Sequence, residues 1–163
     1  MSDGGEAQYV TFGVGEETFA APVSMVREIL DYREAFKIPN GPAYLLGLTD
    51  VRGRGVPTVD LRVRLGLPRA EPTLQTRIVV LDVPVEGRVL SLGLVADRVH
   101  DVVAVQAAEI EPAPDIGVRW RSDYIAGVVR REAGFVVLVD IGRLFTSHEA
   151  VSLEAAADLT FAA

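Results

Sequence analysis

The chain has 163 residues, of which 49% are apolar and 24% charged, a balance typical of a folded globular protein. Its net charge of −7 argues against nucleic acid as a partner, because a negative surface repels phosphate. The absence of cysteine excludes disulfides, thiol nucleophiles and thiolate metal sites.

The N-terminal segment, residues 1–7, is expected to be disordered. It has neither a basic start nor an apolar stretch behind it, so it does not resemble an export signal. No apolar run elsewhere approaches the ~20 residues that a membrane-spanning helix needs. The sequence therefore predicts a cytoplasmic protein with no direct membrane insertion.

The first predicted elements are two strands and a short helix. Residues 8–14 alternate in the manner of a strand, and residues 18–22 follow after a glycine turn. Ser24 can then cap a helix over residues 25–30, because the apolar residues there recur at helical spacing.

A longer segment, residues 44–60, is repeated without a gap as residues 124–140. The five identities are Tyr44, Gly47, Val56, Val59 and Asp60, matched by Tyr124, Gly127, Val136, Val139 and Asp140. A second similarity relates residues 26–30 to residues 99–103. Two copies of one module predict paired domains.

Local signals within the first copy predict a hairpin and a short helix. Residues 47–51 and 55–59 read as strands that turn at Arg52, and Asp60 is placed to cap a helix over residues 61–65. The same pattern recurs around Asp140.

The rest of the chain reads as a linker, a hairpin, further strands and a tail. Residues 66–72 have the composition of a linker, and residues 77–83 with 88–95 predict another hairpin. The alanine-rich tail, residues 147–163, is expected to form a short or frayed helix that the fold does not need. Many short strands with little helix favour small barrels or sandwiches.

The sequence offers no constellation for catalysis. The two histidines are His100, expected to be structural, and His148, which lies in the predicted tail. Neither a nucleophile elbow nor a phosphate-binding loop is present, and the carboxylates are too dispersed for a metal site. We therefore expect no enzyme activity, no cofactor and no metal.

Binding is the better prediction, because two barrels leave a groove in which a partner helix can lie. Glu28 and Arg52 are the charged residues that interrupt otherwise apolar surroundings. They are candidates for recognising a partner, or else ordinary solvated side chains that pair with each other for less than ~1 kcal/mol.

The pattern from Tyr9 to Glu149 resembles the CheW family, the coupling proteins of bacterial chemotaxis. The diagnostic residues are Leu48-Thr-Asp-Val-Arg-Gly53 and Val56-Pro-Thr-Val-Asp-Leu-Arg62, together with Ile38-Pro-Asn-Gly-Pro-Ala-Tyr-Leu-Leu-Gly47, Ile110-Glu-Pro-Ala-Pro114 and Tyr124-Ile-Ala-Gly127.

The resemblance implies a mainly β fold of two SH3-like five-stranded barrels on a shared apolar core, with a few short helices. The CheW-like domain would span residues 8–146, with barrel 1 at about 8–66 and barrel 2 at about 76–146. Exchange of strands or termini between the barrels is possible.

The resemblance also implies a non-catalytic adaptor that binds the cytoplasmic hairpin tip of chemoreceptors and the regulatory domain of the histidine kinase CheA at membrane receptor arrays. The receptor-binding residues would be Val26, Glu28, Arg52 and Val102. The resemblance assigns no residues to the kinase interface.

This sequence departs from the family pattern at Asp50, Arg54, Gly55 and Arg77, which leaves partner specificity open. Arg77 could select a receptor carboxylate or extend its head into water. The alternatives are a paralogue that scaffolds a non-motility pathway such as surface sensing, a detached piece of the kinase, and a small-ligand barrel.

Overall fold

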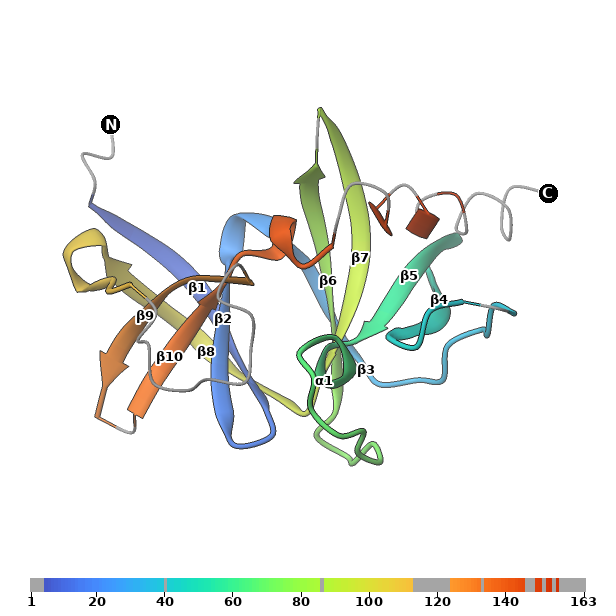
Figure 1. Ribbon diagram of the computed structural model, residues 1–163, viewed down its shortest axis with the longest axis horizontal. Coiled ribbons are helices and arrows are strands. Elements are labelled where there is room, and N and C mark those ends of the chain that lie inside the picture. Colours follow the sequence, from blue (N-terminus) through green and yellow to red (C-terminus); the bar gives the residue numbers. More distant parts are fainter. Residues whose placement is uncertain are drawn as a thin grey trace.

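The computed structural model describes residues 5–39, 41–85, 87–112, 124–132, 134–145, 149–150, 152–153 and 155. Two curled sheets of five strands lie side by side, as Figure 1 shows. The expected mainly β fold with two five-stranded units and little helix is confirmed.

Sheet A has the strand order β8-β1-β2-β10-β9. Its strands are β1 (Glu6–Val14), β2 (Glu17–Pro22), β8 (Arg98–Gln106), β9 (Ile125–Arg131) and β10 (Gly134–Val139). Sheet B has the order β3-β6-β7-β5-β4. Its strands are β3 (Val26–Asp31), β4 (Leu45–Val51), β5 (Arg54–Asp60), β6 (Arg77–Val85) and β7 (Arg88–Ala96).

The two sheets have the same topology, and each combines strands from both halves of the chain. A hairpin pairs in parallel with a second hairpin in each case, through β2 and β10 in sheet A and through β7 and β5 in sheet B. The hairpin β1–β2 therefore lies with β8–β10, and the hairpin β6–β7 lies with β3–β5. The ranges expected for the barrels, 8–66 and 76–146, are each divided between the sheets in this way.

Each sheet curls until its two edges meet. The segment after β3 forms a bridge to β4 through Phe36 and Leu48, and the segment after β8 forms a bridge to β9 through Glu111 and Val128. Each bridge has two backbone hydrogen bonds of 2.7–2.8 Å. Closure satisfies backbone groups that an open edge would leave unpaired.

Glycine is needed where the closing segments cross. A side chain at Gly47 would collide with the carbonyl of Phe36, and one at Gly127 would lie 2.6 Å from Ile110 Cγ2 and 3.0 Å from Glu111 O. The glycine identity between the two copies therefore follows from barrel closure.

The other identities of the repeat also have structural roles. Tyr44 and Tyr124 are 8% and 7% exposed, and their carbonyls accept 2.8 Å hydrogen bonds from the amides of Asp60 and Asp140. The two valine pairs are buried in the same way, with Val56, Val59, Val136 and Val139 at most 8% exposed. The repeat thus preserves the fold of each barrel.

The helices are short. Within the described ranges up to residue 145, they include the 3₁₀ helices η1 (Val23–Met25), η2 (Ala107–Glu109) and η4 (Ile141–Arg143) and the α-helix α1 (Leu61–Arg64). The predicted cap of α1 is confirmed, since Asp60 Oδ1 accepts a 3.1 Å hydrogen bond from Arg62 N.

The helix predicted over residues 25–30 is wrong, because Val26–Asp31 is an edge strand that pairs with β6. The register shifts by one residue between Val26 and Glu28. The equivalent edge strand β8 has its own shift opposite β1, between Val10 and Phe12. The similarity of residues 26–30 to 99–103 therefore reflects two irregular edge strands.

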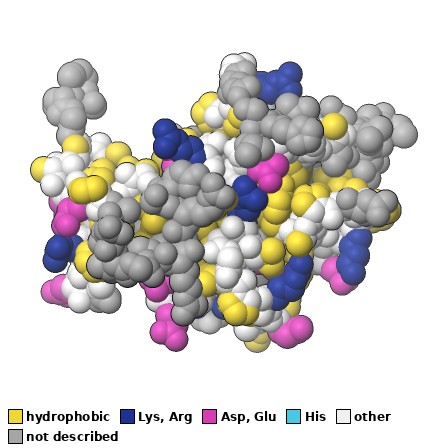
Figure 2. Space-filling model, in the orientation of Figure 1, with side chains coloured by type: hydrophobic (Ala, Val, Ile, Leu, Met, Phe, Trp, Pro, Cys, Tyr) yellow, Lys and Arg dark blue, Asp and Glu magenta, His cyan; other side chains and the backbone are white. Residues whose placement is uncertain are grey.

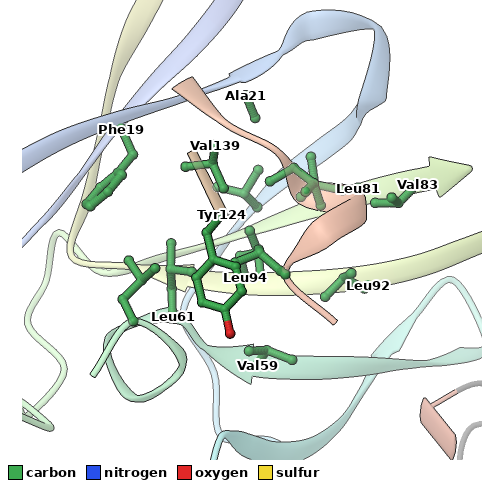
Figure 3. Close-up of a cluster of buried hydrophobic side chains, with 14 of the residues drawn as sticks. Phe19, Ala21, Val59, Leu61, Leu81, Val83, Leu92, Leu94, Tyr124 and Val139 are labelled. Carbon is green, nitrogen blue, oxygen red and sulfur yellow. The ribbon is translucent and has the colours of Figure 1, made fainter. Parts of the chain in front are cut away.

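An apolar core lies between the two sheets, in addition to a smaller buried cluster within each sheet. Figure 3 shows Phe19, Ala21 and Val139 of sheet A facing the same region as Leu81, Leu92 and Leu94 of sheet B, with Tyr124 and Leu61 close by. These residues belong to one cluster of buried side chains. The two sheets are therefore held together by burial of apolar surface.

The ends of the chain differ from the expectation in part. β1 begins at Glu6, within the segment expected to be disordered. At the other end, helical residues occur among 149–155, and Ala150 and Leu153 are 7% and 2% exposed in the shared core. The tail expected to be dispensable therefore contributes to packing.

Candidate functional site

The candidate site is an ion pair between two opposite edges of sheet B. Arg52 Nε and Nη2 lie 3.2 and 3.3 Å from Glu28 Oε2 and Oε1. Glu28 is on β3, and Arg52 is in the turn between β4 and β5. The hydrogen bonds from the guanidinium raise the pKa of Arg52 above its ordinary value. The predicted site residues Glu28 and Arg52 are thus brought together.

The pair is asymmetric in exposure. The side chain of Arg52 is 79% exposed and that of Glu28 is 19% exposed, so the guanidinium covers the carboxylate and faces outward. An exposed pair of this kind contributes little to stability. Loss of the pair should therefore cost the fold little.

The backbone at Arg52 is also unusual. Arg52 has φ 54° and Gly53 has φ 85°, which places both residues of the two-residue turn in the left-handed region. Such turns favour glycine, asparagine or aspartate, and arginine is a poor choice for the first position. Asp50 Oδ1 supports the turn by accepting a 2.9 Å hydrogen bond from Gly53 N.

The apolar candidates lie in different sheets. Val26 is half-buried on β3 and packs against the shared core. Val102 is 54% exposed on β8 of sheet A. Ile29 was missed by sequence reasoning and is 41% exposed on β3. Its side chain points outward because side chains alternate along a strand, and the helix predicted for this segment did not indicate this.

The equivalent positions of the second copy have a different charge pattern. Asp101 occupies the position of Glu28, and Glu132 occupies the position of Arg52. Both carboxylates are exposed. Two like charges cannot form an ion pair, so the Glu28–Arg52 arrangement belongs to one barrel only.

The departures from the family pattern have specific environments. Asp50 supplies the turn acceptor already described. Arg54 and Gly55 begin β5, with Arg54 exposed. Arg77 donates to Leu74 O and Thr76 O at 2.9 and 3.0 Å.

A hollow of about 760 Å³ lies beside sheet B. It is lined by side chains of both charges, including Lys37, Arg62, Arg69, Glu34, Asp60, Glu71 and Asp97. Two of the acidic groups are already engaged, because Asp97 pairs with Arg62 and Asp60 caps α1. Mixed and largely paired charges do not define one class of small ligand.

The described residues contain no group of three or more His, Asp or Glu side chains that could hold a metal ion. Within the same part of the chain, every buried side-chain nitrogen and oxygen has a hydrogen-bond partner. His100 is exposed on β8, and His148 lies outside the described residues.

The charged side chains are dispersed over the surface. Figure 2 shows Lys and Arg side chains spread among Asp and Glu on the face in view, next to areas of apolar side chains. Among the described residues, no helix has the length and apolar character needed to cross a bilayer.

Comparison with known proteins gives consistent matches. The family model described as the CheW-like domain matches residues 8–149. The chain is 36% identical over 149 residues to "Chemotaxis protein CheW" of Rhizobium meliloti, covering 91% of this chain and 93% of that protein. It is 31% identical over 145 residues to "Probable chemotaxis protein CheW" of Rhizobium etli, covering 89% and 91%.

A solved structure has the same fold. The structure is similar to that of the scaffolding protein TtCheW from Thermoanaerobacter tengcongensis, with a TM-score of 0.76 and 24% sequence identity. The match covers 86% of this chain and 88% of that one.

Proposed function

Because this chain belongs to the CheW-like domain family, we propose that it is a non-catalytic adaptor that couples chemoreceptors to the histidine kinase CheA. The partners are the cytoplasmic hairpin tip of the receptor and the regulatory domain of the kinase. The adaptor acts in the cytoplasm and is recruited to membrane receptor arrays through these contacts.

The observation that carries the proposal is the exposed Arg52 guanidinium on a left-handed turn, seated over Glu28. A residue that breaks a local conformational preference without stabilising the fold is a candidate for function. Its position above a carboxylate fixes the direction of the guanidinium. A receptor helix would therefore meet an oriented positive charge.

Apolar contacts would supply most of the binding free energy. Val26, Ile29 and Val102 are at least partly exposed on the edge strands β3 and β8. The charges of Glu28 and Arg52 would then set the register of the helix, since interfacial charges contribute specificity more than affinity. We expect micromolar affinity for one partner, about −8 kcal/mol, and tighter assembly through multivalency.

The direct test is binding of a purified receptor signalling fragment to the wild-type protein and to Arg52→Ala. We expect Arg52→Ala to weaken binding about tenfold or more with little change in the thermal midpoint. The control is Arg130→Ala, which removes a comparably exposed arginine that pairs with Glu111 in sheet A. Equal binding by wild type and Arg52→Ala rejects this role for Arg52.

The receptors that co-purify with the protein from its native cell separate motility from another chemosensory pathway. Recovery of a receptor dedicated to surface sensing would favour the hypothesis that the protein is a paralogue serving a non-motility pathway. Recovery of receptors for soluble attractants would favour chemotaxis.

A further inference from the structure

The helix α1 makes contacts with both sheets through two arginines. Arg62 Nε and Nη2 donate to Asp97 Oδ1 and Oδ2 at 3.1 and 2.7 Å. Asp97 lies at the crossing from β7 in sheet B to β8 in sheet A. The same carboxylate accepts a 2.6 Å hydrogen bond from Gly15 N in the β1–β2 turn. Arg62 thus connects α1 to sheet A.

The second arginine, Arg64, lies among groups from both barrels. Its guanidinium carbon is 4.9, 5.4 and 5.2 Å from the ring centroids of Tyr44, Tyr124 and Phe145. Its Nη2 lies 3.0 Å from Glu149 Oε1, and its Nε donates to Leu144 O at 2.6 Å. Tyr44 precedes β4 of sheet B, whereas Tyr124 precedes β9 of sheet A. The remaining partners, Leu144, Phe145 and Glu149, follow β10 of sheet A.

These contacts are largely shielded from solvent. The side chains of Arg62 and Arg64 are 19% and 16% exposed, compared with 79% for Arg52. Ion pairs and cation–π contacts are stronger at such sites than at the open surface. The planar guanidinium is suited to several directed hydrogen bonds at once, which lysine cannot reproduce.

The second copy lacks both arginines. The residues 80 positions later in the repeat are Gly142 and Leu144, in and after η4. A barrel can therefore form without arginine at these positions. Arg62 and Arg64 therefore belong to the contact between the barrels, which we call the joint, and not to the repeated unit.

We propose that Arg62 and Arg64 are positioning residues that fix the orientation of sheet A relative to sheet B. The shared apolar core holds the sheets together but is not directional. The hydrogen bonds that Arg62 and Arg64 donate from α1 depend on direction, so they can fix the orientation of the sheets. The consequence for signalling, which rests on the proposed function, is that the joint sets the angle between the two bound partners.

The absence of cysteine allows the orientation to be measured directly. Val89→Cys on β7 and Ala126→Cys on β9 place one spin label on an exposed position of each sheet. Distances between the labels are measured by pulsed electron spin resonance in the full-length chain. The wild-type background should give one narrow distance distribution.

In the same labelled background, Arg64→Met should broaden or shift the distribution, because methionine fills space without donating hydrogen bonds. The matched control is Arg130→Met. Arg130 also pairs with a glutamate at 2.9 Å and lies 5.4 Å from an aromatic ring, but both of these partners, Glu111 and Phe135, are on the sheet A side. The control should leave the distribution unchanged.

Circular dichroism checks that each variant is folded. If Arg64→Met does not fold, the measurement on Arg62→Lys decides, since lysine keeps the charge opposite Asp97 but loses the paired hydrogen bonds. A folded Arg64→Met or Arg62→Lys with the wild-type distribution overturns the proposal, as does an equal change in Arg130→Met.

A second arm measures receptor-stimulated kinase activity. Arg64→Met should reduce stimulation about tenfold while each partner binds alone with wild-type affinity. Unchanged stimulation despite an altered distance distribution overturns the link to signalling. If the wild-type protein binds neither partner, the proposed function fails, and the distance measurement still decides the role of the arginines in the joint.

Discussion

The guanidinium of Arg52 covers the carboxylate of Glu28 across the two edges of sheet B, at 3.2 and 3.3 Å, while remaining largely exposed itself. The edges that carry these residues are closed by backbone hydrogen bonds between Phe36 and Leu48. The ion pair is therefore not required for closure. Instead, the pair presents an oriented, exposed guanidinium on the surface of a barrel that is already closed.

Replacement of Arg52 by asparagine should separate binding from stability. Asparagine tolerates the left-handed conformation better than arginine, so Arg52→Asn should melt at the same temperature as the wild type or higher. The same variant should lose receptor binding about tenfold or more. Calorimetric melting and receptor titration check the two effects. A marked fall in melting temperature would show that the arginine serves the fold.

Replacement of Gly47 by alanine should destabilise the protein by about 2–4 kcal/mol. The new methyl group would collide with the carbonyl of Phe36, where the closing segment crosses β4. Gly53→Ala is the matched control, since Gly53 also has positive φ but has no atom near the position of a Cβ. Urea unfolding of the two variants should rank them in this order, and equal losses would contradict the closure argument.

Truncation of Leu153 to alanine should cost about 2–5 kcal/mol. The side chain is 2% exposed in the core that both sheets share. Ser152→Ala, at an exposed neighbouring position, is the control and should have little effect. A wild-type melting temperature for Leu153→Ala would mean that the C-terminal segment does not pack as described.

Asp97→Asn should destabilise the protein near neutral pH by about 1–2 kcal/mol. Burial tends to raise the pKa of Asp97, but hydrogen bonds from Arg62 and Gly15 N outweigh burial and lower it. A depressed folded-state pKa gives a contribution that is present above the ordinary value of about 3.9. The contribution is lost as pH falls through the lower folded value.

The difference in stability between wild type and Asp97→Asn should therefore shrink as acid is added below that ordinary pKa. Asp31→Asn, at a residue whose side chain is 94% exposed, controls for the loss of one negative charge. Urea unfolding at a series of pH values measures the difference. If the difference in stability between wild type and Asp97→Asn stays constant into strong acid, the paired carboxylate of Asp97 is not the source of that difference.

Elements with local signals could be predicted from the sequence. The β4–β5 hairpin, the β6–β7 hairpin and the cap of α1 by Asp60 each depend on neighbouring residues. The repeated Tyr44-to-Asp60 segment also indicated two related units, because its identities serve burial and closure in both copies.

Elements decided by distant contacts could not be predicted in the same way. Met25, Val26, Ile29 and Leu30 fit helical spacing, but pairing with β6 makes most of this segment an edge strand. The division of strands between sheets depends on parallel pairs such as β5 with β7, which no local pattern encodes. Leu153 lay in a segment without a regular apolar stripe, so its burial was also missed.

The candidate site shows the same division. The sequence singled out Glu28 and Arg52 as charges in apolar surroundings and offered their pairing as one alternative, and the resemblance to the CheW family assigned both to receptor binding. The geometry of β3 and the β4–β5 turn was needed to show that the two side chains pair. The arginines of α1 were not singled out, because their partners lie 35 and 85 positions away.

The central claim is that one chain holds a receptor and a kinase at the same time. Analytical ultracentrifugation of a receptor signalling fragment, the CheA regulatory domain and this protein tests it directly. The account predicts a complex of all three proteins, and no complex between receptor fragment and kinase domain when this protein is left out. With Arg52→Ala, only the complex between the variant and the kinase domain should remain. Mutually exclusive binding of the two partners, or no binding of either, would contradict it.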